Sequence, residues 1–73
     1  MIHVVVRCTD NSIQEWEEGE DLVAKLESLQ GQGFEGRALI DRLLTDDWAA
    51  PPLFVTLSGT VRGASISVRI PYD

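Results

Sequence analysis

Apolar and polar residues alternate along the last third of the chain, from Leu53 to Ile70, on both sides of Arg62-Gly63. A period of two is the signature of a β-strand with one buried face. A two-residue loop at Arg62-Gly63 would make this stretch a β-hairpin in which every apolar residue meets an apolar partner. The predicted pairs are Val61 with Ala64, Gly59 with Ile66, Leu57 with Val68, and Val55 with Ile70.

The first strand is predicted over residues 2–8, a short segment that is rich in β-branched residues. Val5 lies on the side opposite Val4 and Val6, so we expect this strand to be central in the sheet and partly covered on both faces. Residues 13–18 allow two interpretations. Ser12 and Glu15 fit a capping box that would start a helix, whereas a loop at residues 10–12 would make a hairpin with Val6 opposite Trp16 and Arg7 opposite Glu15. The sequence favours the hairpin.

Two helices are predicted in the middle of the chain. Residues 20–30 carry an apolar stripe at helical spacing and are followed by Gly31, which suits the C′ position of a helix. Residues 35–44 form the second helix. Its buried side is expected to comprise Leu39, Ile40, Leu43 and Leu44. On the exposed sides we expect ion pairs at i,i+4 spacing, Asp21 with Lys25 and Arg37 with Asp41.

These elements give the order β-β-α-α-β-β. The fold class is therefore α+β, with an antiparallel sheet of about four strands and two short helices packed on one face. The 73 residues form a single small domain.

Size and charge narrow the function. A domain this small buries only about 60% of the surface that its unfolded chain exposes, and the lone Cys8 excludes an internal disulfide, so we expect a homo-oligomer, a dimer first of all. Twelve acids against six bases give a net charge of −6. This charge argues against direct nucleic-acid binding and against binding to anionic membranes. The chain has no recognisable export signal or membrane span, so we expect a cytoplasmic protein.

Residues that could carry chemistry are few. Cys8 and His3 are five residues apart on one strand and so point to opposite faces, which excludes a nucleophile–base pair. Residues 31–36 match G-x-G-x-x-G, but they follow a helix rather than a strand, so we interpret the glycines as helix caps. Thr45, Asp46 and Asp47 could in principle hold a hard cation, although adjacent acids in a turn after a helix are usually solvated. We therefore expect no catalysis, no cofactor and no metal.

Five acids fall within seven residues with no base among them. They are Glu15, Glu17, Glu18, Glu20 and Asp21. They can protect an edge strand and complement a helix N-terminus, keep the protein soluble, or form a surface for a partner. The leading hypothesis is a small acidic, non-catalytic protein-interaction module that binds or inhibits a partner with a basic surface. Small inhibitors, antitoxins and immunity proteins share this composition.

The alternative is a homo-oligomeric structural or regulatory module. The hydroxyl-rich face of the hairpin has no helix to cover it, and Trp48 in the connector before the hairpin is the aromatic residue with the best chance of exposure. The predicted interface residues are Trp48, Phe54, Thr56, Ser58, Ser67 and Arg69.

Overall fold

The computed structural model describes residues 1–44, 48 and 50–73. Its elements follow the order β-β-α-α-β-β, which confirms the predicted α+β fold. The elements are β1 (Ile2–Cys8), β2 (Ile13–Glu18), α1 (Asp21–Gly31), α2 (Gly36–Leu43), β3 (Pro52–Val61) and β4 (Ala64–Pro71).

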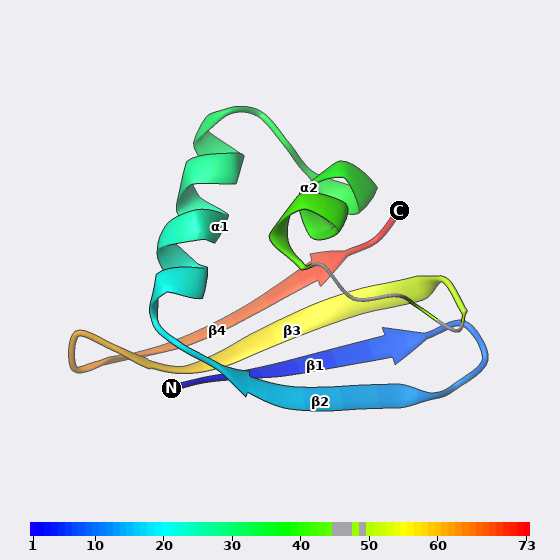
Figure 1. The fold of residues 1–73 in the computed structure, drawn as a ribbon, viewed down its shortest axis with the longest axis horizontal. Coiled ribbons are helices and arrows are strands. Elements are labelled where there is room, and N and C mark those ends of the chain that lie inside the picture. Colours follow the sequence, from blue (N-terminus) through cyan, green and yellow to red (C-terminus); the bar gives the residue numbers. More distant parts are fainter. Residues whose placement is uncertain (45–47, 49) are drawn as a thin grey trace.

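The four strands form one antiparallel sheet in the order β2-β1-β3-β4, and the two helices lie on one face of it (Figure 1). The N-terminal and C-terminal hairpins thus lie side by side, joined by the pairing of β1 with β3. This arrangement confirms that β1 is central and leaves β2 and β4 as the two edge strands.

The β3–β4 hairpin has the predicted register throughout, from Val61 opposite Ala64 to Val55 opposite Ile70. Its loop consists of Arg62 and Gly63, with φ of 52° and 79°. Two successive positive φ angles are the conformation of a type I′ turn, whose twist matches that of the flanking strands. The alternation of the sequence and the turn geometry therefore specify the same register.

The β1–β2 hairpin also forms, but its predicted register is wrong by two residues. Val6 lies opposite Gln14, and Val4 lies opposite Trp16. The loop is residues 9–11, closed by hydrogen bonds from the Asn11 amide to the Cys8 carbonyl and from the Cys8 amide to the Ser12 carbonyl. Asn11 has a φ of 70°, and a three-residue hairpin loop needs its last residue in this left-handed region, which Asn tolerates better than Ser. The alternative helix over residues 13–18 does not form.

The end of α1 corrects a second detail. The C′ residue is Gly33, with a φ of 94°, rather than Gly31, which is the last residue of the helix. The amide of Gly33 donates to the carbonyl of Gln30 and the amide of Phe34 donates to that of Leu29. These are the two bonds of a Schellman motif, which satisfies carbonyls that the helix leaves unpaired.

The core lies between the helices and the covered face of the sheet. It contains the helix residues that the stripes predicted, with Leu39, Ile40, Leu43 and Leu44 all buried. The sheet contributes alternate residues from its strands. Those of lowest exposure are Ile2, Val4, Val6, Cys8, Val55 and Leu57. None of the described helices is long and apolar enough to cross a membrane.

Neither predicted i,i+4 ion pair is present among the described residues, because both bases have tertiary partners. The Lys25 Nζ atom donates to the Leu43 carbonyl at 3.4 Å, which ties α1 to the end of α2. Arg37 lies 3.2 Å from the Asp73 carboxylate. Asp41 accepts a hydrogen bond of 3.1 Å from the Tyr72 hydroxyl. Arg37 and Asp41 of α2 thus interact with residues of the C-terminal segment instead of with each other.

The close approach of β1 and β3 generates a stability prediction. Gly59 has a φ of 150°, and a Cβ atom there would overlap the carbonyl oxygen of Met1 and press on Ile2. We expect Gly59→Ala to lower the free energy of unfolding by about 1–3 kcal/mol. Gly31→Ala is the matched control, because nothing lies within 4 Å of its Cβ position and a helical Gly→Ala change stabilises by about 0.5–1 kcal/mol. Urea denaturation of both variants measures the two changes, and equal effects would contradict the prediction.

The β1–β2 turn generates a pH prediction. The Ser12 hydroxyl and the Ser12 amide both donate to Asp10, and these two bonds hold the pKa of Asp10 below its usual value of 3.8. A lowered pKa in the folded state gives stability that is present above the unfolded pKa and is lost as the pH falls through the folded pKa. We therefore expect the stability difference between wild type and Asp10→Asn to shrink between about pH 5 and about pH 2. Denaturation at several pH values measures it, and a constant difference would contradict the prediction.

Candidate interaction surfaces

Three of the five predicted partner-binding acids lie on edge strand β2, and the other two follow at the start of α1, beside Val61 and Arg62 of the β3–β4 hairpin. Because β2 is an edge strand, its side chains reach the same border from both faces of the sheet. Glu15 and Glu17 project on the open face, and Glu18 projects on the helix side. Glu20 and Asp21 follow directly, at the start of α1, and both are exposed. We call the set of Glu15, Glu17, Glu18, Glu20 and Asp21 the acidic border.

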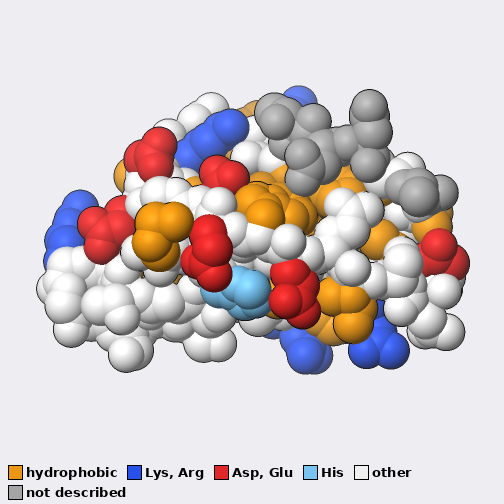
Figure 2. Space-filling model, turned by 60° about the horizontal axis from the view of Figure 1, so that its bottom comes forward, with side chains coloured by type: hydrophobic (Ala, Val, Ile, Leu, Met, Phe, Trp, Pro, Cys, Tyr) orange, Lys and Arg blue, Asp and Glu red, His pale blue; other side chains and the backbone are white. Residues whose placement is uncertain are grey.

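His3 lies between two of these acids on the open face. Its Nδ1 atom is 2.9 Å from Glu17 Oε1 and its Nε2 atom is 3.6 Å from Glu15 Oε2. In Figure 2 this pale blue side chain lies with red side chains on both sides. Because carboxylates only accept hydrogen bonds, both ring nitrogens can donate only when the imidazole is protonated. His3 thus lies within hydrogen-bonding or ion-pairing distance of two acids that the sequence showed only as a run of carboxylates.

Glu18 differs from the other acids because it has a structural partner. Its Oε2 atom accepts a hydrogen bond of 3.1 Å from Trp16 Nε1, and both residues are half-buried. This bond satisfies the indole N–H of Trp16, which packs against the core from the edge strand. Glu18 is thus the member of the acidic border least available to a partner.

The open face of the sheet carries most of the predicted interface residues. Thr56 and Ser58 lie in its middle on β3, and Ser67 and Arg69 lie on edge strand β4. The Arg69 guanidinium stacks on the Phe54 ring, with its carbon 4.3 Å from the ring centroid. This contact covers part of the aromatic surface with a charged group. The face is therefore more polar than its one aromatic residue suggests.

Trp48, the sixth predicted interface residue, does not lie on this face. It is half-buried and packs against the core, so it is less exposed than expected. Because the core lies between the helices and the sheet, this packing places the Trp48 ring on the helix side of the sheet. The predicted interface residues thus divide between the two sides of the sheet.

Cys8 and His3, the residues considered as a nucleophile–base pair, lie on opposite faces of the sheet. Cys8 is fully buried on the helix side, and His3 lies on the open face, as their odd spacing predicted. The described part of the chain brings no three ligating side chains into an arrangement that could hold a metal ion. Thr45, Asp46 and Asp47, the candidate cation ligands, lie outside the described residues.

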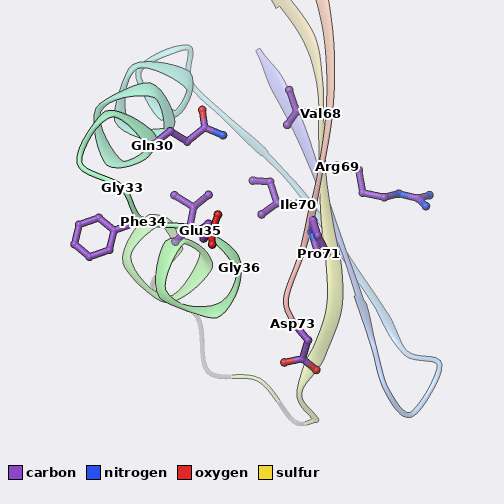
Figure 3. A pocket seen from close by; sticks show the side chains of 11 residues that line it. Gln30, Gly33, Phe34, Glu35, Gly36, Val68, Arg69, Ile70, Pro71 and Asp73 are labelled. Carbon is purple, nitrogen blue, oxygen red and sulfur yellow. The ribbon is translucent and has the colours of Figure 1, made fainter.

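A groove that the sequence did not predict lies between β4 and the link from α1 to α2 (Figure 3). Its volume is about 560 Å³. Its lining residues include Gly33 and Glu35 of the link, Gly36 at the start of α2, and Val68, Ile70 and Pro71 of β4. The glycines of residues 31–36 were interpreted as helix caps only. Their lack of side chains also leaves this space open, which is the signal in the sequence that could have indicated it.

Tyr72 fixes the C-terminal segment beside this groove. Its hydroxyl donates to Asp41, and the Arg37 guanidinium lies over its ring at 5.2 Å. Partial burial, and then the bond to the negative Asp41, raise the pKa of Tyr72 above its usual value of 10.0. Gly36 makes this packing possible. It has a φ of 56°, and a Cβ atom there would lie 3.2 Å from the Tyr72 carbonyl oxygen.

No family model, no curated protein and no solved structure matches the chain. Many unrelated functions share one fold, so the fold alone assigns none. The assignment of a function depends on the surfaces that these 73 residues present.

Proposed function

We propose that this chain is a non-catalytic protein-interaction module that binds a partner with a basic surface through its acidic border. The observation that carries the proposal is the succession of five acids on edge strand β2 and at the start of α1, in a chain whose net charge is −6. Complementary charge of this kind raises association rates and disfavours partners of the same sign.

The exposure of these acids supports the proposal. Glu15, Glu17, Glu20 and Asp21 are all exposed, so a partner could reach them without rearranging the fold. Glu15 and Glu17 share His3, which reduces their net charge only when the imidazole is protonated.

Reversing two of these acids tests the proposal. We expect Glu17→Lys with Glu20→Lys to weaken binding to a partner recovered by affinity purification by about tenfold or more, because two contacts change from attraction to repulsion. We also expect a weaker dependence of the affinity on salt. Calorimetric titration at two ionic strengths measures both effects.

The matched control is Asp10→Lys with Asp41→Lys, two exposed acids in the β1–β2 loop and on α2, which changes the net charge by the same amount away from the acidic border. Both double variants change the net charge by +4, from −6 to −2. If the two double variants bind every recovered partner equally, net charge alone acts and the acidic border has no specific role.

A second candidate function is a homodimer formed through the open face of the sheet. The observation that favours it is the arrangement of the rows across the strands. One row reads Glu15, Val5, Thr56, Arg69 from β2 to β4, and the next reads Ile13, Arg7, Phe54, Pro71. In the first row the two outer residues, Glu15 and Arg69, have opposite charges. In the second row the two inner residues, Arg7 and Phe54, can form a cation–π contact.

A two-fold axis parallel to the strands, between β1 and β3, would use this complementarity. In each row, the first residue would then face the fourth residue of the same row in the second copy, and the second residue would face the third. Glu15 would therefore face Arg69, and Arg7 would face Phe54. Stacked sheets lie about 10 Å apart and rotate by about 30°. Long side chains such as Glu and Arg can bridge that offset.

A charge exchange tests the dimer. We expect wild type to have a mass near twice 8.1 kDa at concentrations of tens of micromolar. Glu15→Arg or Arg69→Glu alone should weaken dimerisation roughly tenfold, and the double variant should restore it, because only the double variant re-forms the pairs. Sedimentation equilibrium measures this, with Glu27→Arg as the control. A monomeric wild type, or a double variant no better than the singles, would contradict the dimer.

A further inference from the structure

The outer edge of β4 presents backbone groups that no other described residue pairs with. In an antiparallel hairpin with a two-residue loop, the residues that flank the loop form a hydrogen-bonded pair, and such pairs then alternate along the strands. Val61 and Ala64 flank the loop, so the even-numbered residues of β4 bond to β3. The bond from the Tyr72 amide to the Leu53 carbonyl continues the same alternation. The amides of Ser65, Ser67 and Arg69 therefore point away from β3, toward the free edge.

The groove lies beside this edge. Figure 3 shows Val68 and Ile70 directed toward the helices, and Arg69 directed to the other face of the sheet. The same three residues line the groove, with the link between the helices forming its opposite wall. A strand added at the usual spacing of about 4.8 Å would direct alternate side chains into the groove over Val68 and Ile70.

The charges around the groove favour a basic occupant. Glu35 and Asp73 line it, and both are exposed. The Arg69 side chain stacks on Phe54 on the opposite face of the sheet. Arg37 offsets part of the Asp73 charge at 3.2 Å, which leaves Glu35 as the acid that faces the groove in Figure 3.

Pro71 limits the length of an added strand. It lines the groove at the end of β4 and has no amide hydrogen to donate. The donors available for pairing near the groove are therefore those of Ser67 and Arg69. Edge strand β2 differs in both respects. It carries Glu15, Glu17 and Glu18, which discourage pairing, and the groove lies at the opposite edge of the sheet.

We propose that the free edge of β4 and its groove bind an extended peptide segment as a fifth strand. One apolar side chain of the segment enters the groove over Val68 and Ile70, and a neighbouring Lys or Arg on the same side meets Glu35. Main-chain hydrogen bonds to Ser67 and Arg69 supply affinity, and the groove supplies selectivity, as in other cases of strand addition. This site is separate from Glu15, Glu17 and Glu18 of the acidic border, which lie at the opposite edge of the sheet.

The test uses a defined peptide, acetyl-Lys-Ser-Val-Ser-Lys-Ser-amide, with the full chain. Its Lys and Val side chains alternate with Ser, so all three can face the groove. We expect saturable shifts of the Ser67 and Arg69 amide resonances in NMR titration, with slower hydrogen exchange of both amides. A peptide with both Ser residues next to Val N-methylated should bind about tenfold more weakly or not at all, because it loses ladder donors. Equal binding of the two peptides, or none by wild type, would overturn the proposal.

Two variants at one position separate the backbone from the side chain. Arg69→Pro removes the free amide hydrogen, at an edge position where proline is tolerated, and Arg69→Ala keeps that hydrogen. Both lose the stacking on Phe54. We expect Arg69→Pro to weaken peptide binding about tenfold relative to Arg69→Ala, with thermal denaturation confirming that both are folded. Equal affinities would overturn the proposal.

Two further outcomes bear on the occupant. Glu35→Gln should weaken binding of the Lys peptide several-fold and leave a peptide with norleucine in place of Lys unaffected, and an equal effect on both would remove the basic preference. If sedimentation shows a wild-type dimer that Arg69→Pro dissociates and Arg69→Ala does not, the fifth strand is β4 of a second copy, which would overturn a separate peptide partner.

Discussion

The pairing of β1 with β3 is the constraint on which the rest of the structure depends. It joins two hairpins that are separated by both helices in the sequence, and it brings Val4 against Leu57 and Val6 against Val55 in the middle of the sheet. All four of these side chains are completely buried. Gly59 permits the close approach at one end of this pairing. Without the pairing of β1 with β3, each hairpin would be a two-stranded ribbon of marginal stability.

Coverage of the sheet on one side determines where interactions can occur. The two short helices bury one face, and the part of the chain that the structure describes forms no further helix or strand over the other. The open face must therefore be polar enough to remain in water, and its hydroxyls, its arginines and the His3 cluster make it so. Among the described residues, the outer edges of β2 and β4 have no strand partner, and one edge carries acids while the other lies beside a groove.

The three surfaces differ in the physical interaction that each can use. The acidic border offers charge, which acts at a distance and is weakened by salt. The open face offers rows of complementary groups that need a second sheet in one orientation. The edge of β4 offers backbone donors, which need an extended chain and are insensitive to its side chains except at the groove. The surfaces share two residues, because Glu15 belongs to both the acidic border and the open face, and Arg69 belongs to both the open face and the edge of β4.

The sequence by itself determined the element order, the β3–β4 register and the buried stripes of both helices, because a period of two or 3.6 states which residues share a face. It left the β1–β2 register wrong by two residues, since several polar residues near that turn could have taken the left-handed position and only the closed loop selects Asn11. It misassigned the partners of Lys25, Arg37 and Asp41, because their partners come from other elements. The groove beside β4 and the clasp of His3 by Glu15 and Glu17 were decided only by tertiary structure. Both features bring together residues from separate elements of the fold, and such contacts cannot be predicted from a local sequence pattern.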